Sequence, residues 1–214
     1  YAIAEMSKVL NVHGKVIPAS NRKVTLHAEL EDGTFIQGES RIPKATAPIK
    51  RVFLTPQNIQ PVPAAINAIK KADVILIGPG SLYTSIIPNL LVKEIGVAVI
   101  KAKAKKIYIC NLMTQRGETG NYRASEHVQA IHNHVGTPFI EAILINKDEL
   151  PKNVMQSYRE ENAEPVQFDV ERLRALNIEI YKEEIAMIEN GTVRHHAVNV
   201  ADWLCHYTRQ LQKE

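Results

Sequence analysis

Short apolar runs alternate with segments of helical periodicity along the middle of the sequence, and this alternation constrains the fold more than any other feature. The apolar runs cover residues 73–77, 106–110 and 140–146. The segments before and between these runs place apolar residues at helical spacing, over 61–71, 88–101 and 125–134. Alternation of this kind is typical of a parallel sheet with helices on both faces. We therefore predict an α/β fold with a three-layer, doubly wound, mainly parallel sheet of the Rossmann type.

A β-hairpin pattern precedes these runs. Alternating apolar residues over 24–30 and 35–40 flank the turn sequence Glu31-Asp32-Gly33-Thr34. We interpret residues 15–48 as a small β lobe inserted into a single α/β domain that spans 1–214, and we expect a further strand over 49–54. The first ten residues have helical spacing but no capping residue before them.

The last third of the sequence predicts more helices and at least one more strand. Helices are expected over 150–161 and 170–176, the second capped by Asp169. Strand or mixed structure is expected over 178–188, ending at Asn190-Gly191, and a final helix over 198–212.

Composition limits the classes of protein to which the chain can belong. Of its 214 residues 45% are apolar, which is enough for one substantial core. Lys and Arg total 26 and Asp and Glu 23, and a formal net charge of +3 does not favour a nucleic-acid-binding protein. The densest basic run, 101–106, has no interleaved aromatic residues, so we interpret it as a solvated helix end and turn.

Cysteine content and hydropathy indicate where the protein resides. Cys110 and Cys205 are the two cysteines, and we interpret both as reduced core residues. The sequence has no apolar run long enough to cross a bilayer and no signal peptide at its start. We therefore expect a cytoplasmic protein without membrane insertion.

The turn after the run 73–77 carries the pattern of a phosphate site. Gly78 and Gly80 permit a sharp turn, Pro79 stiffens it, and the backbone amides that follow can point at an anion. Three hydroxyl side chains add donors, and they belong to Ser81, Thr84 and Ser85. We expect Ser85 to be the N-cap of the next helix, because Pro88 would then lie in its first turn. A tight turn without any ligand is the alternative interpretation.

A second polar loop follows the run 106–110 and should leave the sheet at the same edge. Asn111, Thr114 and Gln115 could hydrogen-bond a ribose, a base or a sugar, and Arg116 could neutralise a phosphate. Glu118 is the carboxylate best placed for acid–base chemistry, although we favour its interpretation as a solvated loop acid.

Two weaker candidates lie elsewhere in the sequence. His127, His132 and His134 do not share one helical face, which argues against a zinc site. Tyr158 and Arg194 offer an aromatic ring and a guanidinium, the groups with which a lid could bind a uracil and a diphosphate. Helix packing for Tyr158 and a solvated charge for Arg194 are the alternatives.

Two longer motifs contain these segments. They read Gly78-Pro79-Gly80-Ser81-Leu82-Tyr83-Thr84-Ser85-Ile86-Ile87-Pro88 and Tyr108-Ile109-Cys110-Asn111-Leu112-Met113-Thr114-Gln115-Arg116-Gly117-Glu118-Thr119. They resemble the gluconeogenesis factor family of bacteria, a branch of the 2-phospho-L-lactate transferase superfamily, and the similarity extends over the whole chain. The resemblance implies a three-layer α/β fold, a cytoplasmic location and ligand contacts from both motifs, including Tyr83 and Thr119.

The family also opens with a strand and a glycine-rich phosphate turn that this sequence does not contain. We therefore expect the chain to correspond to the C-terminal two thirds of the full protein, without the N-terminal strand–turn–helix.

The resemblance further implies a regulator of carbon metabolism and of cell shape that binds a UDP-sugar such as UDP-N-acetylglucosamine. The alternative is a 2-phospho-L-lactate transferase-like enzyme, which moves a phospholactyl group from a nucleotide donor to a deazaflavin and uses magnesium. We favour the regulator, because the phosphate turn is present while no general base or metal cluster is evident in the sequence. Leu82 and Tyr83 also replace the Asn-Pro pair that transferases carry at this turn. We expect a homo-oligomer and a further protein partner, no nucleic acid, and no firm cofactor.

Overall fold

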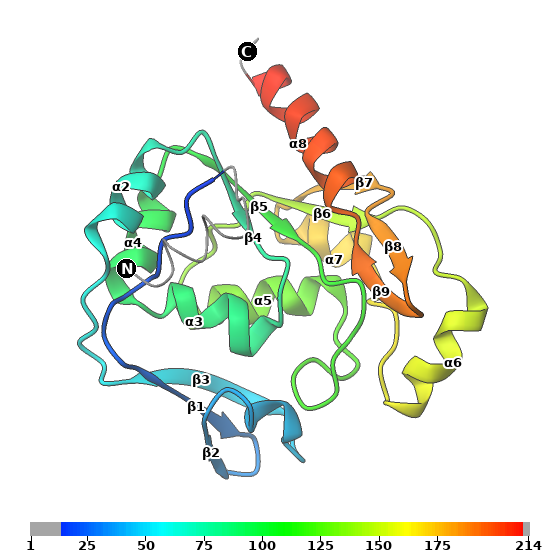
Figure 1. Ribbon diagram of the computed structural model, residues 1–214, viewed down its shortest axis with the longest axis horizontal. Coiled ribbons are helices and arrows are strands. Elements are labelled where there is room, and N and C mark those ends of the chain that lie inside the picture. The colour runs from blue at the N-terminus through cyan, green and yellow to red at the C-terminus, as the bar shows by residue number, and fades with distance from the viewer. Residues whose placement is uncertain (1–13, 212–214) are drawn as a thin grey trace.

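The computed structural model describes residues 14–211, so the helical pattern expected over 1–10 lies outside the described residues. Its centre is a parallel sheet in which β4 (Val74–Ile77), β5 (Lys105–Ile109), β6 (Ala142–Asn146) and β7 (Glu179–Glu183) follow one another in that order (Figure 1). The α/β prediction is confirmed. The strand expected within 178–188 supplies β7 of this sheet.

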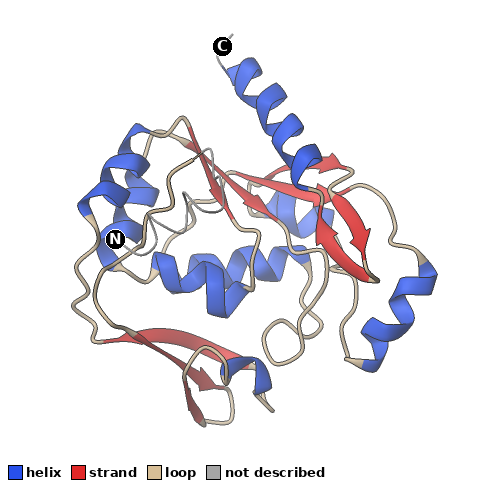
Figure 2. Cartoon of the chain, in the orientation of Figure 1, coloured by secondary structure: helices blue, strands red, loops and turns tan. Residues whose placement is uncertain are grey.

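Side chains alternate between the two faces of the sheet, and both faces are covered. Along β5, Tyr108 faces the main core, whereas Ile107 and Ile109 face the opposite side. The main core includes residues of α5 (Ala124–Val135) and α7 (Val170–Ala175), while α8 (Ala197–Leu211) covers the other face. Covered on both faces, the sheet forms the middle of the three predicted layers (Figure 2).

The predicted β lobe is present as a separate antiparallel sheet. It contains β1 (Thr25–Leu30), β2 (Phe35–Gln37) and β3 (Ile49–Thr55), in the order β2-β1-β3. A short 3-10 helix (Ile42–Lys44) lies between β2 and β3. The strand expected over 49–54 is β3, so this sheet extends beyond residue 48.

The single helix expected over 88–101 is wrong, because the chain forms a bent pair. A wide helical turn (Leu82–Ile86) runs into α3 (Ile87–Leu90), and α4 (Lys93–Lys101) follows at 80° to it. Pro88 lacks an N–H for the regular bond to the preceding turn. The helical run begins at Leu82 with Ser81 before it, so Ser85, expected as the N-cap, lies inside the turn.

Helix α2 (Pro63–Lys71) precedes β4 and contacts α4. Among the described residues no single helix is long and apolar enough to cross a membrane. The bent pair 82–90 and 93–101 reaches that length and hydropathy only when its two parts are counted together.

The C-terminal part contains α6 (Lys152–Glu160) and a hairpin of β8 (Ala186–Glu189) and β9 (Thr192–His195), closed at Asn190-Gly191. Asp169 stands at the N-cap position of α7 as predicted, yet its carboxylate accepts from the backbone and hydroxyl of Ser125 at the start of α5. Cys205 is exposed on α8, so its interpretation as a core residue is wrong, whereas Cys110 is buried.

Two histidines of helix α5, the buried His132 and the half-buried His134, accept hydrogen bonds through a ring nitrogen. The backbone N–H of Val52 in β3 donates to His134 Nε2 at 2.9 Å, which ties the lobe to the main core. The backbone N–H groups of Phe139 and Ile140 lie 3.3 and 3.2 Å from His132 Nε2. An acceptor nitrogen carries no proton, so both imidazoles are neutral.

His127 differs from the other two in its second nitrogen. Its Nδ1 lies 2.9 Å from the carbonyl oxygen of Arg123, and because a carbonyl only accepts, Nδ1 holds the proton. Its Nε2 is buried and has no partner among the described residues. Burial lowers the pKa of His127, His132 and His134, because a charged imidazole would lose its water of hydration.

These lowered pKa values predict a loss of stability on mild acidification. The unfolded chain binds protons as the pH falls through about 6.5, while the folded chain keeps its imidazoles neutral. The free energy of unfolding should therefore fall as the pH drops below about 6.5, until the folded pKa values are reached. Urea unfolding at a series of pH values measures this free energy. His127→Phe should reduce the pH dependence, and the matched control His206→Phe, on an exposed residue of α8, should leave it unchanged.

Candidate functional site

The turn after β4 lies at the carboxyl edge of the main sheet, where the sequence places it. Gly78 has a φ of +86°, and a Cβ there would lie 3.1 Å from the carbonyl oxygen of Ile109. Only glycine therefore lets the chain leave β4 so close to β5. Gly80 has no positive φ, and Pro79 beside it is exposed.

The carboxylate of Glu118 fastens the loop after β5 to the helical turn that begins at Leu82. The backbone N–H of Tyr83 donates to Glu118 Oε2 at 2.9 Å, and the hydroxyl of Thr84 donates to Oε1 at 2.7 Å. The first N–H groups of a helix lack partners within it and carry positive partial charge, which stabilises a carboxylate. The anion at this turn is therefore a side chain of the protein itself.

Glu118 is only 4% exposed, so its interpretation as a solvated loop acid is wrong. Burial raises the pKa of this carboxyl, and the hydrogen bonds from Thr84 and Tyr83 act in the opposite direction.

Asn111 makes a second link between the two loops. Its Nδ2 donates to the carbonyl oxygen of Gly80 at 2.9 Å, and its Oδ1 accepts from the hydroxyl of Tyr108 at 2.7 Å. Tyr108 is fully buried in β5, which fixes the amide. The two polar loops do come together as predicted, but direct hydrogen bonds join them where a crevice was expected.

Two threonines of the second loop accept hydrogen bonds from backbone N–H groups, one in the segment after α6 and one within the loop itself. The hydroxyl of Thr114 accepts from the backbone N–H of Glu164 at 2.9 Å, and that of Thr119 accepts from the backbone N–H of Gln115 at 3.0 Å. Both threonines are buried, whereas Gln115 is half-buried and Arg116 exposed. Ligand contacts from these residues remain predictions.

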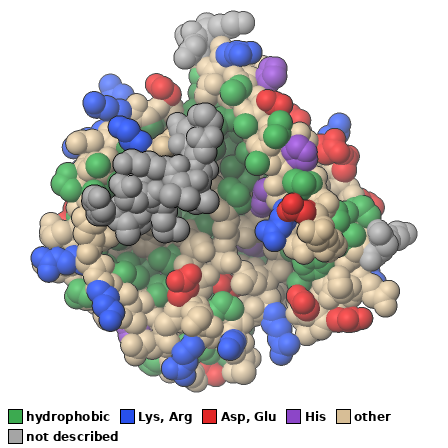
Figure 3. All heavy atoms as spheres, in the orientation of Figure 1, with side chains coloured by type: hydrophobic (Ala, Val, Ile, Leu, Met, Phe, Trp, Pro, Cys, Tyr) green, Lys and Arg blue, Asp and Glu red, His purple; other side chains and the backbone are tan. Residues whose placement is uncertain are grey.

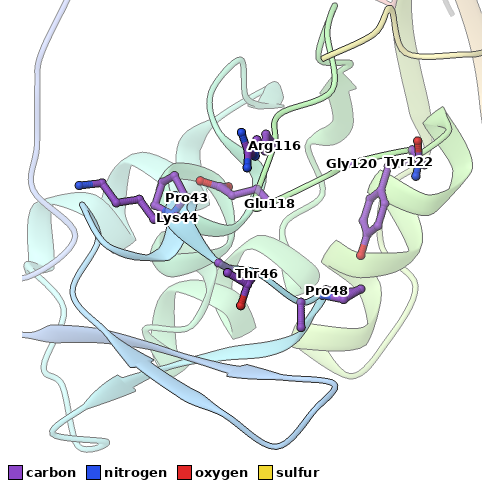
Figure 4. Close-up of a pocket in the computed structure, with 12 residues that line it drawn as sticks. Pro43, Lys44, Thr46, Pro48, Arg116, Glu118, Gly120 and Tyr122 are labelled. Atoms are coloured by element: carbon purple, nitrogen blue, oxygen red, sulfur yellow. The ribbon is translucent and has the colours of Figure 1, made fainter. Parts of the chain in front are cut away.

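A cavity of about 640 Å³ opens between this loop and the β lobe (Figure 4). Residues 43–48 form one side, and residues 116–122 except Thr119 form the other. The two sides touch at Gly117, where φ is +78° and an added Cβ would lie 2.1 Å from the carbonyl oxygen of Pro43. Gly78, Gly80 and Ser81 do not line this cavity, so the predicted phosphate turn and the cavity share only the loop that Glu118 anchors.

Tyr83 and Tyr122 connect that cavity to the core. Their hydroxyl oxygens lie 2.8 Å apart, and Figure 4 shows the Tyr122 ring directed toward Pro48. Tyr83 itself is buried, which raises the pKa of its phenol. Lys44 and Arg116 bring positive charge to the rim.

Tyr158 and Arg194, predicted as a lid, lie on neighbouring elements. The hydroxyl of Tyr158 in α6 accepts from the backbone N–H of Val193 in β9 at 2.8 Å. Tyr158 also lines a cavity of about 450 Å³ together with Thr114, Gln115 and Arg116. Arg194 does not line it, and its Nε lies 3.5 Å from Glu189.

Sequence reasoning missed the contribution of the lobe. Lys44, Thr46 and Tyr122 border the cavity of about 640 Å³ because the lobe contacts the second loop, and no local sequence pattern predicts that contact. The glycine at position 117, where the two parts touch, was the one sequence signal for it. Within residues 14–211, no three His, Cys, Asp or Glu side chains are gathered in a way that could hold a metal ion.

Comparison with known proteins relates the chain to one family. A sequence model of the family described as 2-phospho-L-lactate transferase CofD matches residues 1–186. The gluconeogenesis factor of Bacillus subtilis is 53% identical over 204 residues, which cover 95% of this chain and 64% of that protein. The gluconeogenesis factor of Halalkalibacterium halodurans is 50% identical over 200 residues, 94% of this chain and 62% of that protein.

Solved structures agree with these matches. A crystal structure of a Bacillus halodurans protein has a TM-score of 0.89 at 50% identity and covers 94% of this chain and 65% of that one. A second has a TM-score of 0.88 at 50% identity and covers 92% of this chain and 64% of that one. The chain thus spans less than two thirds of the length of these relatives.

The buried position of Glu118 predicts a specific loss of stability. Glu118→Ala removes the acceptor of Tyr83 and Thr84 and should lower the free energy of unfolding by about 1–3 kcal/mol. Glu118→Gln retains one acceptor oxygen and should lower the free energy of unfolding by less. Urea unfolding measures both, with Glu31→Ala as a control at an exposed carboxylate. Equal effects of Glu118→Ala and Glu31→Ala would contradict this role.

Proposed function

This chain belongs to the 2-phospho-L-lactate transferase CofD family, and from that premise we propose that it is part of a nucleotide-sugar-binding regulator of central carbon metabolism. The name of its relatives, gluconeogenesis factor, supports the metabolic role. We further propose UDP-N-acetylglucosamine as the ligand, the cytoplasm as the location, and a second role in cell-shape control, all of which the sequence resemblance implies.

The observation that carries this proposal is that the Glu118 carboxylate is hydrogen-bonded within the protein. Its two oxygens accept from Tyr83 and Thr84, so the one buried carboxylate of the site is already committed. Asn111 is committed in the same way to Gly80. What remains for a ligand is a set of binding groups and not of proton-transfer groups.

The binding groups suit a sugar diphosphate. The Ser81 hydroxyl makes no capping hydrogen bond, and the exposed hydroxyl of Ser85 lies one helical turn further along. Arg116 borders both cavities and offers a guanidinium that can bind a diphosphate through two donors. Tyr158 offers a ring on which a uracil could stack.

The family match also favours a second candidate, a transferase that moves a phospholactyl group. Such an enzyme needs a group that binds the transition state more strongly than the substrate, usually a metal ion, an acid or a base. Residues outside the described part of the chain would have to supply it. The two candidates therefore differ in what happens to the bound nucleotide, and the next experiment separates them.

Full-length protein incubated with UDP-N-acetylglucosamine and magnesium should return the nucleotide sugar intact while its melting temperature rises with ligand concentration. Mass spectrometry of the ligand and a thermal-shift titration measure the two quantities. Ser81→Asp places a negative charge at the phosphate turn and should abolish the shift, whereas Ser40→Asp at an exposed position of the lobe should not. Turnover of the nucleotide sugar, or phospholactyl transfer to a deazaflavin, would contradict the regulator.

The predicted lid generates a further test. Tyr158→Ala removes the ring and should weaken UDP-N-acetylglucosamine binding, while Tyr158→Phe loses only the hydrogen bond to Val193 and should retain most of the affinity. Arg194→Ala should also weaken binding if its guanidinium reaches the diphosphate. Calorimetric titration measures the dissociation constants. Unchanged affinity in both single variants, Tyr158→Ala and Arg194→Ala, would contradict the predicted lid.

A further inference from the structure

Helices α2 and α4 enclose a groove of about 740 Å³ far from the candidate site. Its apolar lining includes Ile66 and Val97, and Val97 is 41% exposed. Helix α2 has no fully buried residue, so its apolar side is only half covered by the core. Exposed apolar surface beside a helix pair is the property of a docking surface.

The rim of this groove is strongly basic. Four exposed lysines and a single acid, Glu94, line it, and the lysines are Lys70, Lys93, Lys101 and Lys103. The lining alone therefore holds a net charge of +3, the same as the formal net charge of the entire chain. A partner for this groove must combine apolar side chains with negative charge.

The β8–β9 hairpin has those two properties. Met187 and Ile188 are 36% and 40% exposed. Successive strand residues point to opposite faces, so the two side chains lie on opposite faces of β8. The face of Ile188 packs on the core in part, through Ala186 and Val193, and the face of Met187 is turned away from it. Glu183, the last residue of β7, and Glu184 are exposed in the chain that leads into β8. An exposed strand with apolar residues on both faces indicates an interface.

Charge is also divided along the chain in a complementary way. Residues 1–110 contain 15 Lys and Arg against 7 Asp and Glu, whereas residues 111–214 contain 11 against 16. The groove belongs to the first part and the hairpin to the second. In Figure 3 several Lys and Arg side chains lie along the left edge and several Asp and Glu side chains on the right, although both kinds also occur elsewhere on this face.

We propose that the groove between α2 and α4 binds the β8–β9 hairpin of a second copy of this chain. Met187 and Ile188 of one copy would cover Ile66 and Val97 of the other, and Glu183 and Glu184 would face the lysine rim. A nucleic acid would satisfy the lysines but has no aliphatic side chain for the apolar lining, so the second copy fits both halves of the surface.

This pairing has a geometric consequence. The groove and the hairpin lie at opposite ends of the molecule (Figure 1). Each copy therefore binds one neighbour through its groove and another through its hairpin, a head-to-tail interface that grows into a ring or a chain.

Charge reversal on full-length protein tests the interface from both sides. The groove variant combines Lys93→Glu with Lys103→Glu, and the hairpin variant combines Glu183→Lys with Glu184→Lys. Sedimentation velocity at low salt should show concentration-dependent association of the unmodified protein, weakened about tenfold or more in either variant. The control, Arg172→Glu with Arg209→Glu on exposed residues of α7 and α8, makes the same charge change as the groove variant outside both surfaces and should associate normally.

A mixture of the two variants provides the decisive measurement. The groove variant retains its hairpin, the hairpin variant retains its groove, and the two reversed surfaces are complementary to each other, so the mixture should associate although neither variant does so alone. A protein that carries all four substitutions should associate with itself again. Circular dichroism confirms that every variant is folded. The proposal is overturned if the unmodified protein stays monomeric at low salt, if the groove variant associates normally, or if the mixture remains monomeric.

Discussion

The hydrogen bonds from Tyr83 and Thr84 to the Glu118 carboxylate hold the carboxyl edge of the sheet together. They join the turn after β4 to the loop after β5. Gly117, the neighbour of Glu118, touches the lobe at Pro43, so the same loop also positions the lobe. A buried carboxylate is costly unless its oxygens are satisfied, and here two donors at a helix start satisfy them. The Glu118 side chain therefore joins two parts of the fold, and the residue next to it contacts a third.

This arrangement determines what the site can do. A helix N-terminus is an anion site because its first amides are free, and in this protein Glu118 already occupies part of that site. An external phosphate would have to bind beside the carboxylate, at the amides and hydroxyl around Ser81, and it would need a cation to reduce the repulsion between the two negative charges. A turn whose carboxylate is already bound within the protein suits recognition, which supports the proposed regulator more than an enzyme.

The local elements could be predicted from the sequence, and the contacts between them could not. Strand and helix periodicity found β4 to β7, the lobe hairpin and the position of the Gly78 turn, because each depends on residues close together in the chain. Whether Glu118 is solvated or buried depends on Tyr83, 35 residues away, and loop composition contains no information about that distance. The bent helix pair was missed for a different reason, since apolar spacing over 88–101 continues through the break at Leu91 and Val92.

Helix α5 contacts both the lobe and the residues beside the candidate site. At its C-terminal end His134 accepts from the backbone N–H of Val52 in the lobe. His127, about two turns earlier on the same helix, packs against the rings of Tyr108 and Tyr122. The lobe shares the main apolar core and contacts α3 through β3. The bond to α5 and the Gly117–Pro43 contact add to this packing, and the cavity lies beside the second of them. A ligand that enters between Lys44 and Arg116 touches the lobe and the Glu118 loop at once. A ligand that binds one position of the lobe better than another would shift the lobe relative to the sheet, and the proposed regulator could signal ligand binding through that displacement.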